Sequence, residues 1–330
     1  MMQEFERIER LRKRVEGTVN KHVKVAIGDD AAVVGTEPDE DHVVTTDTMV
    51  EGVHFLPTTM SWYDIGYKCM AASVSDVAAM GGRPIAAVLA LAVPEELDFE
   101  HLEMVYDGVA GLCKEFSCSL AGGDLTRTSG PLVLTSTVLG AVPKDRALLR
   151  SGAQPGDVVF VTGQVGTSAA GLELLVGTAV VPVDSQLELR QAHQRPLPQV
   201  TAGQILLDAG ASACNDISDG LASEANEIAA MSGVRLRIDS ARIPISPAVR
   251  DFSRAVRKNP LDYAWYGGED YQLIGTASSR SFAVALARCE SVGVKLTAIG
   301  RVEAGDGVVA EDENGTLNVI EAKGFNHFSK

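Results

Sequence analysis

Apolar and polar positions alternate along this chain in blocks that predict helices and strands in turn. In the first half the spacing predicts a charged amphipathic helix over 1–20, a strand over 41–46, a helix over 64–80, a strand over 85–93, a helix over 99–116 and a strand over 131–142. In the second half it predicts a strand over 158–162 and a helix over 200–208. A second helix follows the Asp216 segment and ends at residue 231, and a strand follows over 234–238. This alternation favours an α/β or mixed α+β architecture.

A connection rich in proline and glycine divides this pattern. Residues 150–157, Arg-Ser-Gly-Ala-Gln-Pro-Gly-Asp, have the composition of a loop. With 330 residues, 45% of them hydrophobic, the chain is long enough for two domains that each bury a core. We therefore expect an N-terminal domain over 1–148 and a C-terminal domain over 149–330.

Aspartates recur beside Gly, Ser or Thr where the apolar runs end. These acidic segments are Ile27-Gly-Asp-Asp30, Thr45-Thr-Asp47, Ser75-Asp76, Gly122-Gly-Asp124 and Asp216-Ile-Ser-Asp219. Because Mg2+ takes oxygen ligands and keeps positions for phosphate and water, the segments indicate a metal-dependent enzyme that handles phosphates. We expect these segments to form turns, with Asp47 at the end of its strand and Asp76 in the last third of its helix.

A single aspartate in a turn usually caps a helix or forms an Asx turn. Asp219 could cap the helix that follows it, and Asp47 could simply close its strand. Each has a second oxygen donor beside it, Ser218 and Thr46, and paired donors suit a hard cation.

Phosphoryl transfer depends mainly on in-line positioning and charge stabilisation. A phosphate acceptor is already ionised at neutral pH, so no dedicated base is required.

Four other residues are candidates for contacts with ligands. His54 could reach a ligand on the same rim as Asp47, or could be a strand histidine bonded to backbone. Arg150 could bind a phosphate through two hydrogen bonds of its guanidinium, or form a surface salt bridge. Glu269 follows two glycines and could contact a cationic ligand. Phe325 could stack on a cationic ring, or anchor the C-terminus.

Charge and composition exclude several classes of protein. Lys and Arg number 29 against 44 Asp and Glu, and the net charge of −15 argues against nucleic-acid binding. The five cysteines form no Cys-x-x-Cys pair, which indicates reduced thiols in a cytoplasmic protein. The chain has no apolar segment of about 18 residues, so we expect no membrane partner. The chain has no P-loop motif, although the glycine-rich stretch 163–171 could bind an anion at a helix N-terminus.

Taken together, these motifs resemble the thiamine-monophosphate kinase family, in the family's order and over nearly the whole chain. The residues that carry the resemblance are Ile27-Gly-Asp-Asp-Ala31, Thr45-Thr-Asp-Thr48 through His54-Phe-Leu56, Ser75-Asp-Val-Ala-Ala-Met-Gly81, Gly122-Gly-Asp124, Asp216-Ile-Ser-Asp-Gly-Leu221, Gly267-Gly-Glu-Asp-Tyr271 and Lys323-Gly-Phe-Asn-His-Phe328.

The resemblance implies an activity and a fold. The activity is transfer of the ATP γ-phosphoryl group to thiamine monophosphate with Mg2+, giving thiamine diphosphate and ADP, the last step of thiamine diphosphate biosynthesis. The fold is the two-domain one shared with aminoimidazole ribonucleotide synthetase. In that fold the N-terminal sheet pairs across a homodimer, and ATP lies in a cleft close to the dimer interface.

The resemblance also assigns roles by position. The implied metal ligands are Asp30, Thr45, Thr46, Asp47, Asp76, Asp124, Asp216 and Asp219, and Asp47, Asp124 and Asp216 would act catalytically through metal. The implied nucleotide contacts are Gly123, Asp124, Arg150, Ser218 and Tyr106, and the implied substrate contacts are His54, Glu269 and Phe325. Phe325 stands where other members have Tyr or Trp, and Thr45 where some have Ser.

Relatives with other reactions share this fold, so the fold alone does not fix the function. Selenophosphate synthetases have a Cys or selenocysteine near the N-terminus and hydrogenase-maturation proteins end in a reactive Cys. Here the first cysteine is Cys69 and the chain ends in His327-Phe-Ser-Lys330. An enzyme of the aminoimidazole ribonucleotide synthetase type fits the Gly267-Gly-Glu-Asp segment poorly. A non-catalytic nucleotide or thiamine-phosphate sensor would lose metal-binding carboxylates, and none is missing.

Overall fold

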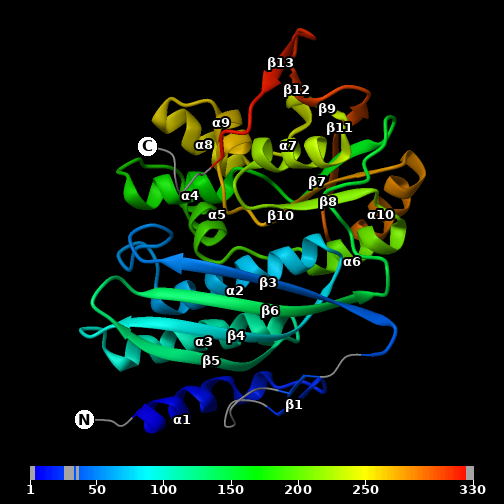
Figure 1. The fold of residues 1–330 in the computed structure, drawn as a ribbon. Coiled ribbons are helices and arrows are strands. Elements are labelled where there is room, and N and C mark those ends of the chain that lie inside the picture. The colour runs from blue at the N-terminus through cyan, green and yellow to red at the C-terminus, as the bar shows by residue number, and fades with distance from the viewer. Residues whose placement is uncertain (1–3, 26–32, 35–36, 325–330) are drawn as a thin grey trace. The chain divides into compact units, whose positions relative to one another are not determined.

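The chain folds into two compact units. The structure, a computed structural model, describes residues 4–25, 33–34 and 37–324, and only the backbone of 4–9, 24–25 and 33–34. The first unit comprises Met1–Val77 with Gly82–Asp145, and the second comprises Ala78–Gly81 with Arg146–Lys330. Both units combine helices with a mixed sheet (Figure 1), which confirms the predicted α/β class.

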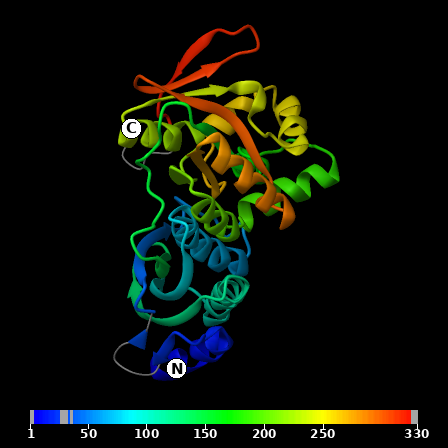
Figure 2. The same cartoon turned by 90° about the vertical axis from the view of Figure 1, so that its right-hand side faces the viewer.

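The first unit is a four-stranded sheet with helices on one face. Its described elements are α1 (Glu4–Val15), a 3-10 turn (Glu16–Thr18), β1 (Val23–Val25), β2 (Val33–Val34), β3 (Glu40–Val50), α2 (Trp62–Ala79), β4 (Arg83–Pro94), α3 (Phe99–Glu115), β5 (Ser119–Thr128) and β6 (Val133–Pro143). Among the described residues the sheet order is β3-β6-β4-β5, and only β4 and β5 run parallel. Helices α2 and α3 lie on the same side of this sheet in Figures 1 and 2.

Two acidic segments lie inside strands, where turns were expected. Asp47 pairs with Ser136 in the interior of β3, which continues to Val50 because its whole length is bonded to β6. Asp124 lies within β5, paired with Ala90 of β4. The prediction that these aspartates follow strand ends is therefore wrong, since pairing with distant strands extends β3 and β5 through polar positions. Asp76 lies in the last third of α2, as predicted.

Helices α2 and α3 approach each other backbone to backbone through glycines. A Cβ atom on Gly108 would lie 1.9 Å from the carbonyl oxygen of Tyr63, and one on Gly66 would lie 1.9 Å from the carbonyl oxygen of Val105. This close contact explains why Gly66 in the 64–80 segment and Gly108 in α3 carry no side chain.

The second unit is a seven-stranded sheet with helices on both faces. Its elements are β7 (Val158–Thr162), α4 (Thr167–Val176), α5 (Val183–Gln194), α6 (Val200–Ala209), β8 (Ala213–Ile217), α7 (Leu221–Ser232), β9 (Arg235–Asp239), a 3-10 turn (Ser240–Arg242), α8 (Pro247–Val256), α9 (Pro260–Tyr266), β10 (Gln272–Ala277), α10 (Ser279–Ser291), β11 (Leu296–Glu303), β12 (Gly307–Glu311) and β13 (Leu317–Ile320). Within the described part of the chain the order is β13-β12-β9-β11-β7-β10-β8, so the β12–β13 hairpin lies at one edge (Figure 2).

Strand β7 is buried on both faces of this sheet. Val159 and Val161 belong to a core with Ala225 of α7, whereas Phe160 belongs to a second core with Leu206 of α6. This two-sided burial explains why the 158–162 segment is apolar without alternation.

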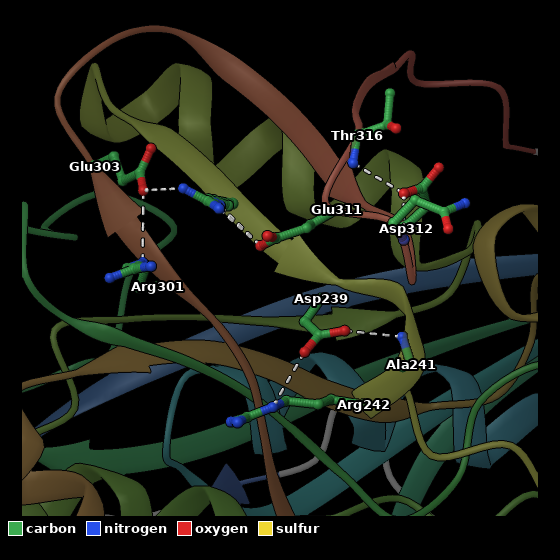
Figure 3. Close-up of polar contacts among 10 residues, drawn as sticks. Asp239, Ala241, Arg242, Arg301, Glu303, Glu311, Asp312 and Thr316 are labelled. Atoms are coloured by element: carbon green, nitrogen blue, oxygen red, sulfur yellow. Dashed lines mark hydrogen bonds and ion pairs between the residues drawn. The ribbon is translucent and has the colours of Figure 1, made fainter.

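One end of the sheet carries a polar face instead. Along β9, buried Leu236 and Ile238 alternate with half-buried Arg237, whose guanidinium lies 3.4 Å from Glu303 and 2.8 Å from Glu311. Figure 3 shows Glu303 joined also to Arg301. Ion pairs as exposed as these contribute little to stability.

None of the helices in the described ranges is long and apolar enough to cross a membrane.

The α2–α3 contact generates a stability prediction. Gly108→Ala should lower the free energy of unfolding by about 1–3 kcal/mol, because the new methyl group meets a backbone carbonyl that cannot move away. The measurement is urea unfolding followed by circular dichroism. Gly130→Ala is the control, since a Cβ there makes only an ordinary 3.5 Å contact. Equal stability of the two variants would contradict the proposed packing.

Candidate functional site

Strand β3 and helix α2 bring four oxygen-bearing side chains together in the first unit. The Ser73 hydroxyl donates to Oδ2 of Asp47 at 2.9 Å, and the Thr45 hydroxyl donates to Oδ2 of Asp76. Alternate residues of a strand share a face, as do helix residues three apart, so Thr45 and Asp47 face Ser73 and Asp76. The structure thus gathers three of the predicted metal ligands and adds Ser73.

Burial dominates the electrostatics of Asp47. Desolvation raises the pKa of its carboxyl, while the hydrogen bond from Ser73 and the charge of His54 lower it by smaller amounts. His54 lies in the turn after β3, where its Nδ1 accepts from the backbone N–H of Val50 at 3.0 Å. His54 is thus bonded to backbone, as the alternative has it, but in a turn and not in a strand, and its charge also acts on Asp47.

Thr46 and Asp124 do not join this group within the first unit. Thr46 faces the opposite side of β3, where its Oγ1 accepts from the Thr137 hydroxyl at 3.0 Å. Asp124 is exposed on β5, at the other edge of the sheet from β3. Three strand spacings of about 4.8 Å place these two edges roughly 14 Å apart.

Packing accounts for two of the predicted nucleotide contacts in the first unit. A Cβ on Gly123 would lie 2.2 Å from the carbonyl oxygen of Leu89, so the close approach of β4 requires a glycine there. Tyr106 is buried in α3, and burial raises the pKa of its hydroxyl. Neither observation identifies a ligand contact.

In the second unit the predicted residues cluster where β8 leads into α7. Asp216 is 3% exposed within β8, and Ser218 and Asp219 follow it. The N-cap of α7 is Gly220, and no side chain caps the helix. The alternative that Asp219 caps this helix is therefore wrong, because the helix begins at Leu221 and Gly220 holds the cap position.

Glu224, which the sequence motifs did not identify, organises this turn. Its Oε1 accepts from the Asp219 N–H at 3.2 Å and from the Ser218 hydroxyl at 3.4 Å. Burial, followed by the charges of Asp216, Glu227 and Asp219, raises the pKa of Glu224 to about 8. A glutamate in the first turn of a helix that follows an acidic segment is the sequence signal that could have revealed it.

Arg150 is held beside the same turn. Its Nε donates to Oδ1 of Asn215 at 3.0 Å, and its Nη1 lies 3.1 Å from Glu227. Asn215 in turn donates to Glu224 and Glu227. The surface salt bridge considered for Arg150 is thus present, and it aligns the guanidinium next to the acidic cluster.

The Gly267–Tyr271 loop packs against the β8–α7 turn. The backbone N–H of Glu269 donates to the carbonyl oxygen of Ser218 at 2.7 Å, and that of Tyr271 donates to Ile217 at 2.9 Å. A Cβ on Gly268 would lie 2.6 Å from the Ser218 oxygen, so only glycine permits this approach. Glu269 therefore lies beside the acidic turn.

The neighbouring Asp270 occupies the N-terminus of α4. Its carboxylate accepts from the N–H groups of Gly166 at 2.5 Å and Ser168 at 3.0 Å. The expectation that stretch 163–171 offers these groups to a bound anion is therefore wrong, because an internal carboxylate fills the position. Burial raises the pKa of Asp270 to about 7.

Two predicted site residues, Asp30 and Phe325, lie outside the described residues. The chain before Phe325 runs to the acidic turn of the second unit. Asn226 of α7 donates to the carbonyl oxygen of Ile320 at 3.0 Å, and a Cβ on Gly324 would lie 2.3 Å from the Asp219 oxygen.

Comparison with known proteins decides the family. The N-terminal and C-terminal domain models of the AIR synthase related protein family match residues 28–142 and 154–313. Thiamine-monophosphate kinase of Bacillus subtilis (strain 168) is 40% identical, covering 99% of this chain and 100% of that protein. The chain belongs to the thiamine-monophosphate kinase family. The resemblance inferred from its motifs is confirmed.

Solved structures of thiamine-monophosphate kinases match this chain along nearly its whole length. The crystal structure from Stenotrophomonas maltophilia K279a has 38% identity and a TM-score of 0.84, covering 96% of this chain and 98% of that chain. The structure of AaThiL complexed with AMPPCP and TMP has 35% identity and a TM-score of 0.79, covering 99% of this chain and 97% of that chain. The two-domain fold expected for the family is confirmed.

The donor set fits the hard cation expected for a thiamine-monophosphate kinase. Both units present carboxylate and hydroxyl oxygens, the ligand types that Mg2+ prefers. The raised pKa values of Asp47 and Glu224 show that burial disfavours the charged carboxylates there, and a cation would offset this effect. Among the described residues no three Asp, Glu, His or Cys side chains form a group that could hold a metal ion.

Asp270 generates a prediction on pH dependence. An acid whose pKa is raised on folding binds more protons in the folded state, so stability falls as pH rises from its ordinary value of 3.8 to about 7. The wild type should therefore lose more stability than Asp270→Asn between pH 5 and pH 7, by up to about 1.4 kcal/mol per pH unit. Urea unfolding across this range measures the difference.

The matched control is Asp306→Asn, which removes an exposed carboxylate from the same unit. Its stability should follow the wild-type pH dependence. Parallel pH profiles for the wild type and Asp270→Asn would show that this carboxyl keeps its ordinary pKa in the folded protein.

Proposed function

We propose that this protein phosphorylates thiamine monophosphate with ATP, giving thiamine diphosphate and ADP, the last step of thiamine diphosphate biosynthesis. The carrying observation is the full-length match to thiamine-monophosphate kinases, one of them solved with the ATP analogue AMPPCP and with TMP. The bond between the γ-phosphorus and its bridging oxygen breaks, and a phosphate oxygen of thiamine monophosphate forms the new bond. ADP carries away the electron pair of the broken bond.

We infer that the chain's own residues contribute mainly binding and orientation. The acceptor phosphate is already ionised, so the transfer needs no protein base. Magnesium, when bound, would neutralise the triphosphate and stabilise the charge that develops in transfer. The proposed ligands are Asp30, Thr45, Thr46, Asp47, Asp76, Asp124, Asp216 and Asp219, with Asp47, Asp124 and Asp216 acting catalytically through metal.

We assign the remaining residues to the two substrates. Ser218 and Arg150, together with Gly123, Asp124 and Tyr106, are the proposed nucleotide contacts. Arg150 is supported by its alignment on Asn215, because a held guanidinium loses less freedom when it binds phosphate. The proposed contacts with thiamine monophosphate are Glu269, His54 and Phe325, and Glu269 provides the anion that the thiazolium cation requires.

The activity and the role of Asp47 can be tested together. The wild type should form thiamine diphosphate from ATP and thiamine monophosphate in the presence of Mg2+. Chromatography measures the thiamine diphosphate that is formed. Asp47→Asn should reduce kcat by at least about 100-fold, since losing electrostatic stabilisation of a transition state typically has that effect. Its fold should persist, because asparagine still accepts from Ser73.

The control is Asp39→Asn, the same change at an exposed residue just before β3. This variant should keep wild-type turnover. A wild type that forms no product with any divalent metal would exclude the kinase function, and full turnover in Asp47→Asn would exclude that residue from the mechanism.

We further propose that the protein is a cytoplasmic homodimer formed through the sheet of the first unit. The face of this sheet opposite α2 and α3 exposes Val44 (67%) and Val88 (39%), which is unfavourable in water. All five cysteines are buried free thiols, which fits a reducing compartment.

The dimer can be tested at Val44. Val44→Lys should convert the protein to a monomer in sedimentation equilibrium, because a charge would be buried in the proposed interface. Val319→Lys, at a residue 76% exposed on β13 of the second unit, should remain dimeric. A Val44→Lys protein that stays dimeric would place the interface elsewhere.

A further inference from the structure

Glu269 is held in a backbone conformation that side-chain-bearing residues seldom adopt. Its φ angle is +64°, in the left-handed region. The Glu269 N–H donates to the carbonyl oxygen of Ser218. The carboxylate of the next residue, Asp270, accepts a hydrogen bond at the N-terminus of α4. Such strain persists only where surrounding contacts enforce it, and it often marks functional positions.

A buried histidine lies against the Glu269 side chain. His193 is 1% exposed, and its Nδ1 lies 3.5 Å from Oε2 of Glu269. The same nitrogen lies 3.1 Å from the hydroxyl of Ser168, which is itself fully buried. The Ser168 backbone N–H binds Asp270, so one short stretch of α4 contacts both the histidine and the Gly-Glu-Asp loop.

Close helix packing brings His193 to this place. Helix α5 lies against α4 at Gly171, where a Cβ would lie 2.0 Å from the Leu189 carbonyl oxygen and 3.1 Å from the His193 Cβ. His193 occupies the last turn of α5. A buried polar ring in a tightly packed interface is costly unless its nitrogens are bonded, and here Nδ1 lies within reach of the Ser168 hydroxyl and of Glu269.

We propose that His193 is a positioning residue that orients the Glu269 carboxylate for the cationic part of thiamine monophosphate. The inference rests on the proposed function and deepens it. Glu269 is 27% exposed in its side chain, and the adjacent imidazole restricts the rotamers open to its carboxylate. Freezing a glutamate side chain corresponds to roughly tenfold in affinity. His193 therefore favours binding of the cationic substrate without contacting ATP.

The test replaces His193 by Leu and by Met, which fill the space without a ring nitrogen, and by Asn, whose amide stands near the Nδ1 position. KM and kcat are measured for thiamine monophosphate and for ATP separately. His193→Leu and His193→Met should raise KM for thiamine monophosphate about tenfold. KM for ATP and kcat should stay within about twofold, and His193→Asn should recover most of the loss.

Two further variants separate positioning from simple packing. In a Glu269→Gln background, which itself raises KM for thiamine monophosphate, His193→Leu should add less than about twofold, because the two residues act as one unit. Gln191→Leu, at an exposed position of the same helix, should behave as the wild type.

Each outcome decides. An unchanged KM for thiamine monophosphate in the apolar variant that folds, or an equal effect with and without Glu269, overturns the inference. Equal losses for both substrates together with a lower Tm would show that His193 only packs. If the wild type forms no thiamine diphosphate, the proposed function fails and the inference fails with it, whereas normal wild-type activity with unchanged His193 variants overturns the inference alone.

Discussion

The burial of carboxylates next to one another is the constraint on which the rest of the structure depends. Asp47 beside α2, Asp216 near the end of β8 and Glu224 in the first turn of α7 are all removed from most of the solvent. In a chain of net charge −15, ionising such groups is unfavourable unless a cation or a donor compensates. The hydroxyl of Ser73 and the backbone N–H of Asp219 compensate only in part. A cation bound at these positions would offset this cost.

Close backbone packing makes this arrangement rigid. Gly66 and Gly108 let α2 and α3 touch, which sets α2 and hence Asp76 against β3. In the second unit Gly268 lets the Gly-Glu-Asp loop reach the β8–α7 turn. Because each contact involves a backbone carbonyl, it cannot relax as a side chain could. Within each unit the charged groups are thereby held close to fixed positions.

His193 and Asp270 extend the same logic to the Gly267–Tyr271 loop of the second unit. Both are buried, and both contact the first turn of α4. Neither stands out in the sequence, since His193 lies on an ordinary amphipathic helix and Asp270 is one of two acids after a glycine pair. Only their spatial relation to Glu269 gives them meaning. Glu269 is thus held among residues that are themselves buried.

The sequence by itself determined the family and the α/β class, because these depend on local spacing and on motifs in order, and it singled out the segments proposed to hold the site. It placed Asp76 correctly in its helix, since helical periodicity is a local property. It misplaced Asp47 and Asp124 in turns, because pairing between strands distant in the chain decides where a strand ends. Glu224 carries a sequence signal in its place in the first helical turn, but only the tertiary structure showed its raised pKa, which arises from burial and neighbouring charges.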